Sequence, residues 1–360
     1  MMLNREELVA LYRKHNRQRV LSLYLNAEEH DPAKRRAWRR ALDKVIDGAR
    51  ARVQPEERAG FDRALAHLKL ELKRHDAFLP DAGWAGFAVP DQLIHAGTVS
   101  VVMPNLARWE DGLRVAPYVR ALRRAEPVIT VLADRRQARL FHQANGQFVE
   151  LPEIRADMFF GDLTDVNMSK RATTHTGVRG ATDTDAARRL EEVGTERLLK
   201  ALVEQLRELA NRGGSVVVGG TDEISAQLLH RLPRRLQTRA IEEPSISFHD
   251  SLAELKRASR KAAGTITARH HSALVDEVLD LARSGGRGCL GAERTAQSLR
   301  EGRVEVLLLS RRFGEQQPEF SDFYVGSAFE QGADVEELID EAGQRLDREG
   351  GIGARLRFTV

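Results

Sequence analysis

The sequence contains one cysteine, Cys289, and no apolar run that approaches the roughly 20 residues needed to cross a bilayer. A single cysteine excludes an internal disulfide and is typical of a protein kept in a reducing cytosol. The first residues, Met1–Arg19, are charged and follow a helical pattern, which does not resemble a secretory signal. We therefore expect a cytoplasmic protein that makes no membrane contact.

A strong net charge is also absent, because 56 Lys and Arg residues oppose 53 Asp and Glu residues and leave a formal charge of +3. The basic residues are nevertheless clustered, and arginine predominates among them. Such clusters on a balanced chain indicate local contact with phosphates rather than global binding of a polyanion. The alternative is a solvated helix face. The clusters are Lys34, Arg35, Arg36, Arg39 and Arg40, and Arg231, Arg234, Arg235 and Arg239.

The composition that remains is that of a folded chain. A hydrophobic content of 42% and a charged content of 30% exclude a disordered protein, and 360 residues suffice for two or three domains. In the first block, Arg19–Leu25 alternates as a strand does, and Asp31 followed by Pro32 predicts the start of a helix. Further strands are expected over "WAGFAVP" (84–90) and "TVSVVMP" (98–104).

A second block begins near Glu126-Pro127. The sequence predicts strands over Val128–Ala133 and Ala138–His142, a turn at Asn145-Gly146 and a third strand. A helix over Thr184–Asn211 follows, with leucines on one face, and Gly213-Gly214 ends it. The next strand, Ser215–Gly220, is expected to lie parallel to an earlier one because a helix intervenes. The pattern of this block therefore predicts an α/β unit.

A third block begins near Glu243-Pro244, after which the pattern predicts several further elements. The segment 314–332 lacks periodicity and is interpreted as an ordered insertion or a mobile loop. The expected elements are helices over Ser251–Ala263, Ser272–Arg283, Glu293–Glu301 and Val335–Asp347, a glycine-rich turn over 284–291, and a strand over Val304–Ser310.

Several stretches occur in the order found in one known family. They are "VITVLADRRQARLF", "SVVVGG", "LLHRLPRRLQTRAI", "GRGCLGAERTAQSLREGRVEVLLLS" and the terminal "GGIGARLRF". Together they resemble the archaeal and eukaryotic class-1 peptide-chain release factors and their relative Pelota, over nearly the whole chain. The sequence is most similar to the bacterial branch, which includes the Balon-type ribosome hibernation factors.

The resemblance implies an α/β protein of three domains, 1–125, 126–242 and 243–360, that enters the ribosomal A site. In the family, the first domain faces the decoding centre and the second enters the peptidyl-transferase centre. The third is similar to a small ribosomal RNA-binding protein and contacts a translational GTPase or the stalk base. By this resemblance the first basic cluster would contact small-subunit rRNA, and the factor-side contacts would be Gly286, Arg287, Gly288 and Gly291.

The stretch "HTGVRGATDT", His175–Thr184, stands where release factors carry Gly-Gly-Gln. The two adjacent glycines and the glutamine are missing from this loop (171–185), as is the Asn-Ile-Lys-Ser motif that reads stop codons. The resemblance therefore implies a protein that is not an enzyme. We expect His175, Gly177, Arg179 and Gly180 to contact rRNA instead, the alternative being a solvent-exposed linker that caps the next helix.

No cofactor or metal is expected from the remaining motifs. His270 and His271 are adjacent rather than at ligand spacing, and Asp183 and Asp185 lie where a helix cap is sufficient. "SGGRGCLG" lacks the Gly-Lys-Ser/Thr ending of a nucleotide-binding loop, and Cys289 is interpreted as a buried small residue.

These observations leave three functional hypotheses. The first is a ribosome-binding factor that occupies the A site of vacant or stalled ribosomes, for hibernation or rescue, with a translational GTPase such as elongation factor Tu as a further partner. The second is a hydrolase that cleaves peptidyl-tRNA or another ester with the altered loop. The third is an RNA-binding protein unrelated to the A site. The missing tripeptide favours the first hypothesis over the second, and the full-length resemblance favours it over the third.

Overall fold

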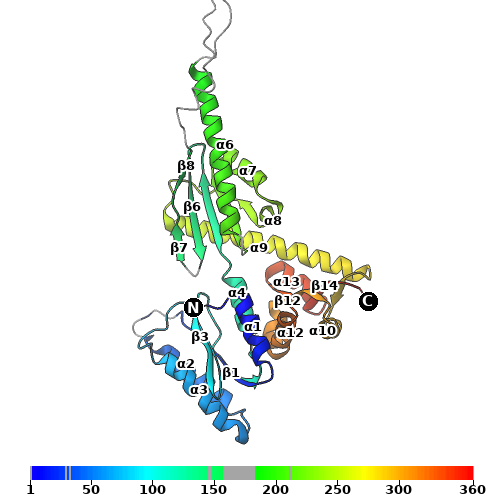
Figure 1. The fold of residues 1–360 in the computed structure, drawn as a ribbon. Helices are drawn as coiled ribbons and strands as arrows, with labels where there is room; N and C mark the ends of the chain where they lie inside the picture. Colours follow the sequence, from blue (N-terminus) through cyan, green and yellow to red (C-terminus); the bar gives the residue numbers. More distant parts are fainter. Residues whose placement is uncertain are drawn as a thin grey trace, which may run out of the picture. The chain divides into compact units, whose positions relative to one another are not determined.

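The fold is taken from a computed structural model, which describes residues 2–28, 31, 34–144, 147–156, 183–210 and 213–359. The chain forms two compact units, one made of residues 1–125 with 268–360 and the other of 126–267 (Figure 1). Both units combine helices and strands, which confirms the predicted mixed α/β class. Within the described part of the chain, no helix is long and apolar enough to span a membrane.

The first sheet of the larger unit is antiparallel and has the strand order β3-β2-β1-β4. Its central strand β1 alternates between two cores: Leu21 and Leu23 pack under α2 and α3, whereas Val20 and Tyr24 face the opposite side. This alternation confirms the predicted first strand. The elements are α1 (Arg5–His15), β1 (Arg19–Asn26), α2 (Ala37–Arg50), η2 (Pro55–Glu57), α3 (Arg58–Leu72), β2 (Gly83–Val89), β3 (Gln92–Val99), β4 (Leu106–Asp111) and α4 (Ala116–Arg124).

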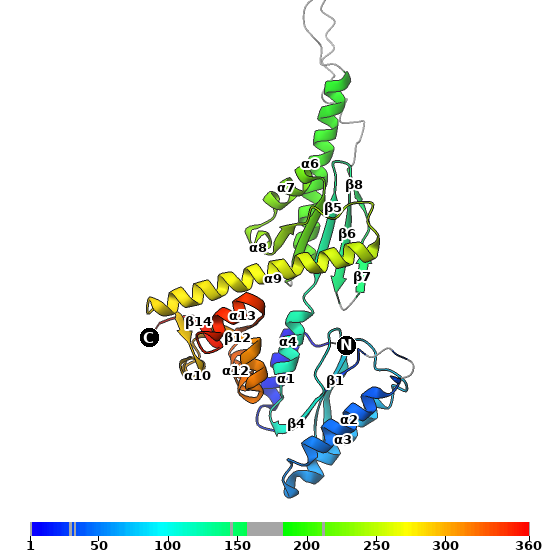
Figure 2. The same cartoon turned by 180° about the vertical axis from the view of Figure 1, so that it is seen from behind.

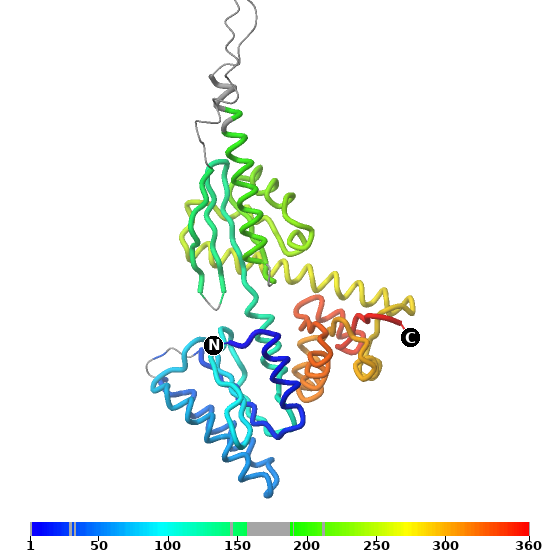
Figure 3. The backbone as a smooth tube through the Cα atoms, in the orientation of Figure 1, coloured from blue at the N-terminus to red at the C-terminus, as the bar shows by residue number. Residues whose placement is uncertain are grey.

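The second sheet of this unit has the order β11-β14-β12-β13, with β12 and β13 parallel and the other pairs antiparallel. It shares a hydrophobic core with the back of the first sheet, and α1 lies beside α12 in this core (Figure 3). The rings of Tyr12 and Phe329 meet there edge to face at 6.2 Å. The elements are β11 (Gly288–Leu290), α10 (Ala292–Arg300), β12 (Val304–Ser310), α11 (Arg311–Gln316), α12 (Pro318–Glu330), β13 (Asp334–Leu338), α13 (Asp340–Asp347) and β14 (Ile352–Leu356).

A half-buried ion-pair network also joins the two parts of this unit. The Asp322 carboxylate on α12 accepts hydrogen bonds from Arg114 Nε at 2.9 Å and Arg120 Nη1 at 2.8 Å. Burial lowers the pKa of Arg114, but the carboxylates of Glu110, Asp322 and Glu319 raise it by more, so the guanidinium stays charged. Residues 1–125 and 268–360 are therefore held by charge as well as by a common apolar core.

The Asp322→Asn variant should lose about 3 kcal/mol of unfolding free energy, because two largely buried guanidinium groups would lose their shared carboxylate. The Asp322 side chain is only 9% exposed. Asp334→Asn is the matched control, since Asp334 pairs with Arg5 at the surface and a surface pair contributes at most about 1 kcal/mol. Urea unfolding measures both, and equal losses would contradict a structural role for the Asp322 network.

The smaller unit contains one sheet of the order β10-β9-β5-β6-β7, with β8 paired to β6. As predicted, β5 and β9 are parallel. Helices α6, α7 and α8 cover one face, and the first half of α9 covers the other (Figure 2). The elements are β5 (Val128–Ala133), β6 (Gln137–Ala144), β7 (Gln147–Glu150), β8 (Ile154–Arg155), α6 (Asp183–Leu209), β9 (Ser215–Gly220), α7 (Asp222–Arg231), α8 (Arg234–Gln237), β10 (Ala240–Glu242) and α9 (Leu252–Arg283), which continues into the larger unit.

Helix α9 differs from the prediction of two helices separated by a gap at 264–271. The helix is continuous because Ile266 and His271 extend its buried stripe through this segment, and Gly264 has open space around it. Helix α12 also contradicts the interpretation of 314–332 as an insertion or loop. Its side chains are buried on several faces, so the 3.6-residue alternation that marks a surface helix is missing.

Three further predictions are wrong at their boundaries. The helix expected over Val335–Asp347 begins at Asp340, because residues 334–338 pair with β12 as a strand. The strand expected over 98–104 is β3, which ends at Val99 and reaches back to Gln92, where it forms a hairpin with β2. The helix expected from Asp31-Pro32 begins at Ala37, after Arg36 adopts a left-handed backbone with φ of 69°.

Candidate nucleic-acid interface

The first basic cluster lies immediately before and within the first turn of α2. Arg36 Nη2 contacts the Asp76 carboxylate at 2.9 Å, and Arg39 Nη2 contacts the same carboxylate at 3.4 Å. Arg39 also lies over the Trp38 ring, with its guanidinium carbon 5.2 Å from the ring centroid. Arg35 and Arg40 are exposed and form no ion pair with any described residue. One acid therefore faces two of the cluster's cations, and the cluster keeps a local positive charge.

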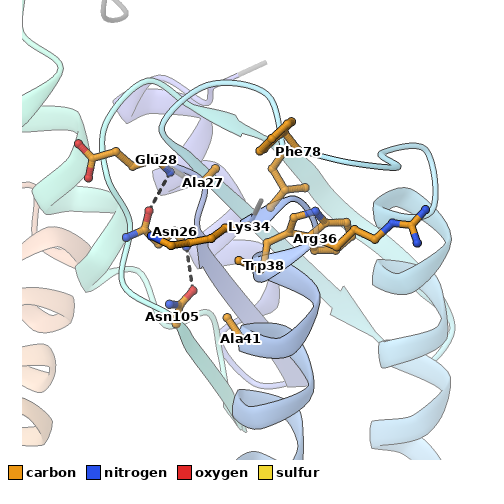
Figure 4. A pocket seen from close by; sticks show the side chains of 11 residues that line it. Asn26, Ala27, Glu28, Lys34, Arg36, Trp38, Ala41, Phe78 and Asn105 are labelled. Carbon is orange, nitrogen blue, oxygen red and sulfur yellow. Dashed lines mark hydrogen bonds between the residues drawn. The ribbon is translucent and has the colours of Figure 1, made fainter. Parts of the chain in front are cut away.

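Beside this cluster is an open cavity of about 340 Å³, which is within the range of small-ligand sites (Figure 4). Trp38 forms part of its wall and donates its indole N–H to the Ala77 carbonyl at 3.2 Å. The side-chain oxygens of Asn26 and Asn105 each accept a backbone N–H at 2.9 Å, which fixes both amides. The lining residues are Asn26, Ala27, Glu28, Lys34, Arg36, Ala37, Trp38, Ala41, Phe78, Leu79 and Asn105.

The lining of this cavity suits a planar polar ligand next to a phosphate. Phe78 offers an aromatic surface and Lys34 lies beside it in the lining, whereas the guanidinium of Arg36 pairs with Asp76. Within the described residues, neither amide nitrogen of Asn26 or Asn105 donates a hydrogen bond to a protein group. Aromatic surface, amide donors and cations together are what proteins use to hold an unstacked nucleotide of single-stranded RNA.

The glycine-rich turn 285–291 lies between α9 and α10, and two of its candidate contact residues have clear structural roles. Gly291 has φ of 82° and precedes the first residue of α10. Gly288 packs against α9: a Cβ on it would lie 2.6 Å from the Ala282 nitrogen and 2.7 Å from the Val278 oxygen. Arg287 is exposed, and its carbonyl accepts the N–H of Leu356 at 2.8 Å. These geometric demands account for Gly288 and Gly291, and the proposed factor contact of Gly286, Arg287, Gly288 and Gly291 stays a prediction.

Gly288→Ala should destabilise the protein by about 2 kcal/mol, because the added methyl group would overlap backbone atoms that cannot move aside. Gly264→Ala is the control, since a Cβ there meets nothing within 4 Å and alanine favours a helix by about 0.5–1 kcal/mol. Urea unfolding followed by circular dichroism gives both values. A Gly288→Ala protein as stable as the wild type would show that the turn is loosely packed.

The loop candidates His175, Gly177, Arg179 and Gly180 lie outside the described residues, so their contacts stay a prediction. The second basic cluster is described and is spread over α7, α8 and the residue before β10. Arg231 pairs with Glu196 on α6, whereas Arg234 and Arg235 are exposed and pair with no described acid. Part of this second cluster is therefore neutralised within its own unit.

The middle of the chain matches a known protein family. Residues 114–264 match the model of a family described as bacterial archaeo-eukaryotic release factor family 10. Residues 114–264, which make up less than half of the chain, are thus similar to this family. This finding confirms the resemblance seen in the sequence. No protein with curated annotation matches the chain.

Three solved structures show low similarity to this chain. Dom34 of S. cerevisiae, a translation termination-like factor, has a TM-score of 0.45 and 11% identity over 66% of this chain and 64% of its own length. The chain thus spans less than two thirds of Dom34. Archaeoglobus fulgidus Pelota has a TM-score of 0.35 and 17% identity, covering 77% of this chain and 80% of Pelota. The archaeal termination factor aRF1 has a TM-score of 0.27 and 17% identity over 99% of both chains.

The adjacent histidines lie beside the buried carboxylate of Glu336. Glu336, only 6% exposed, pairs with Arg123, and the Nε2 atoms of His270 and His271 lie 3.7 and 3.6 Å from its carboxylate. Burial first, then the positive charges of His270 and Arg123, lowers the pKa of His271 to about 4. His271 is therefore neutral at pH 7. No group of three metal-ligating side chains occurs among the described residues.

Cys289 is buried, as the sequence predicted for a small core residue. Its sulfur lies 3.7 Å from Ser298 Oγ, which donates to it, and 3.8 Å from Thr295 Oγ1. All three side chains are at most 7% exposed, and they pack under α10. Cys289 thus contributes to the packing of β11 against α10.

Helix α9 carries basic residues that the sequence patterns did not single out. Over 255–275 the sequence contains no Asp or Glu but has Lys256, Arg257, Arg260, Lys261 and Arg269. The signal was present in the spacing of 257, 260, 261 and 264, which lie on one helical face. The sequence alone does not show which acids fold next to these residues, so it does not distinguish this face from any other solvated helix face.

Proposed function

We propose that this protein is a ribosome-associated translation factor that occupies the A site of vacant or stalled ribosomes without hydrolysing peptidyl-tRNA. The family match over residues 114–264 carries the proposal. Two exposed surfaces with RNA-binding chemistry support it: the Lys34–Arg40 cluster and the cavity beside it. Protection of idle ribosomes or rescue of stalled ones is the role that follows, because a factor in the A site excludes tRNA.

The sequence supports the non-hydrolytic part of the proposal. The tripeptide Gly-Gly-Gln occurs nowhere in the 360 residues, and the loop 175–185 has Gly177-Val178-Arg179-Gly180. Hydrolysis of the ester depends on donors placed at the developing negative charge, and the loss of one such donor typically costs roughly 10²–10³ in rate. Arginine has no acceptor atom and does not reproduce the amide of glutamine. We therefore propose that the loop contacts rRNA through His175 and Arg179.

We further propose that a translational GTPase, for which elongation factor Tu is the bacterial candidate, contacts the face around Gly286–Gly291. In the solved structures, yeast Dom34 is described as interacting with Hbs1, and an archaeal Pelota has been described bound to the ribosome with ABCE1. The exposed Arg287 side chain beside β11 is the residue of this turn best placed to reach a partner.

Co-sedimentation with purified ribosomes tests the proposal. The protein should pellet with vacant ribosomes, and a tRNA bound in the A site beforehand should prevent this binding, whereas a tRNA in the P site alone should not. Ribosomes from starved and from growing cells are compared to learn which state holds more protein. Binding that is indifferent to A-site tRNA would exclude the A site as the place of action.

A further inference from the structure

The first half of α9 presents a basic face directly opposite the side that anchors it. Leu255, Ala262 and Ile266 are buried, and Ser259 is fully buried in the same stripe. Ser259 Oγ accepts the hydroxyl of Thr130 on β5 at 2.7 Å and donates to the Leu255 carbonyl at 2.6 Å. This buried contact holds the helix to the sheet in one rotation, so its outer face is fixed.

That outer face consists of Arg257, Arg260, Lys261 and Gly264, which follow helical spacing and are exposed. None of these three cations forms an ion pair with a described residue. The nearest acid on the helix, Glu254, accepts hydrogen bonds from Ser251 Oγ at 2.7 Å and Ser251 N at 2.9 Å. These bonds lower the pKa of Glu254, and the positive charge of Arg257 lowers it further. Three other exposed arginines of the unit, Arg155, Arg188 and Arg207, each have a glutamate beside them, whereas Arg234 and Arg235 pair with no described acid.

We infer that this face, Arg257, Arg260 and Lys261, binds the phosphate backbone of RNA, an assignment that rests on the proposed ribosome-bound function. The three cations lie within about 6 Å along the helix axis. Their linear density matches a nucleic-acid strand, which carries one charge per roughly 3.4 Å of duplex axis. Two of the three are arginines, whose planar guanidinium groups suit phosphate oxygens.

The chemistry of the face favours RNA over an acidic protein. Protein interfaces depend on buried aromatic or large aliphatic anchors at their centre. The one exposed large apolar residue described on α9 is Leu252, which lies five positions before Arg257. The half-buried residues beside the cations are Ala258 and Ala263, and Gly264 leaves room for a close approach. The face therefore offers charge without an apolar anchor, as backbone recognition requires.

The test compares two triple variants of equal charge. Arg257→Gln, Arg260→Gln and Lys261→Gln remove the face, whereas Arg155→Gln, Arg188→Gln and Arg207→Gln remove three ion-paired arginines of the same unit. Glutamine is a good helix former, so α9 should persist, which circular dichroism checks. The probes are whole ribosomes, protein-free ribosomal RNA and a labelled RNA duplex of 24 base pairs, each titrated between 50 and 300 mM salt.

A plot of the logarithm of the association constant for RNA against the logarithm of the salt concentration has a negative slope. Loss of three phosphate contacts should make this slope shallower by roughly 2–3 and weaken binding at 100 mM salt at least tenfold. The control triple variant should change the slope by less than one. Equal effects of the two triples would show that only net charge matters, and this would overturn the inference. Normal binding of protein-free RNA with lost ribosome binding would assign the face to an acidic ribosomal protein and would also overturn it. If the wild type does not bind ribosomes, the proposed function fails, but the duplex titration still decides the role of this face.

Discussion

Ribosome binding by the protein is expected to fall steeply as salt rises, because each phosphate neutralised by Lys or Arg releases counterions on binding. Reversal of Arg35, Arg36, Arg39 and Arg40 to glutamate should weaken binding further. If each of the four contacts one phosphate, the wild type loses roughly a hundredfold in affinity between 50 and 200 mM salt through this cluster alone. In a sedimentation assay, the affinity of the reversed variant for ribosomes should therefore fall less steeply between 50 and 200 mM salt, by about the same factor of a hundred.

The structure refines this experiment, because Arg36 and Arg39 contact Asp76 and their reversal would place three acids together. Arg35→Gln with Arg40→Gln avoids that repulsion, since neither side chain pairs with a described residue. The matched control neutralises two exposed basic residues of α3 instead, Arg58→Gln with Lys69→Gln. If salt does not affect binding, or if the α3 control weakens it equally, the first cluster has no role in binding.

Peptide release by the wild-type protein should stay at the buffer rate with any stop codon in the A site. The double variant Val178→Gly with Arg179→Gln restores Gly-Gly-Gln at 177–179 and provides the gain-of-function test. If the loop reaches the peptidyl-transferase centre, this variant should release peptide at least 10²-fold faster than the wild type, since it recovers a missing transition-state donor. The assay is release of labelled peptide from peptidyl-tRNA on programmed ribosomes.

Control variants distinguish a loop that contacts rRNA from a loop that hydrolyses peptidyl-tRNA. Arg179→Gln alone lacks the second glycine and should remain inactive, because Val178 restricts the backbone angles that Gly-Gly-Gln uses. His175→Ala with Arg179→Ala should weaken ribosome binding by roughly 1–3 kcal/mol if both side chains make charge-assisted hydrogen bonds. Wild-type release that disappears in Arg179→Ala would instead establish a hydrolase. An inactive double variant together with unchanged binding would leave the loop as a linker and helix cap.

Local sequence patterns predicted much of the fold. The strands β1, β5, β9 and β12 and the long helix α6 lie where alternation, apolar runs and leucine spacing placed them. The parallel pairing of β5 with β9 followed from the intervening helix. Elements whose burial comes from distant parts of the chain were missed. The sequence of β13 resembles the start of a helix, and the segment is a strand because it pairs with β12. Helix α12 is buried on several sides, so its sequence shows no helical period.

The candidate site was predictable only in part, for the same reason. The sequence located the cations of the first cluster, but not Asp76, which is 37 residues after Arg39 and faces two of them. It could not reveal the cavity, because Asn26, Trp38, Phe78 and Asn105 come from four separate segments. The charge balance of a surface depends on which acids fold next to it. For this reason the unpaired face of α9 became recognisable only once its neighbours were known.

The central claim, occupancy of the A site, is tested most directly by cryo-electron microscopy of vacant ribosomes saturated with the purified protein. We expect density for residues 1–125 at the decoding centre and for the loop 171–185 at the peptidyl-transferase centre, with no A-site tRNA in the same particles. Protein density outside the A site, or particles that hold both the protein and an A-site tRNA, would contradict it.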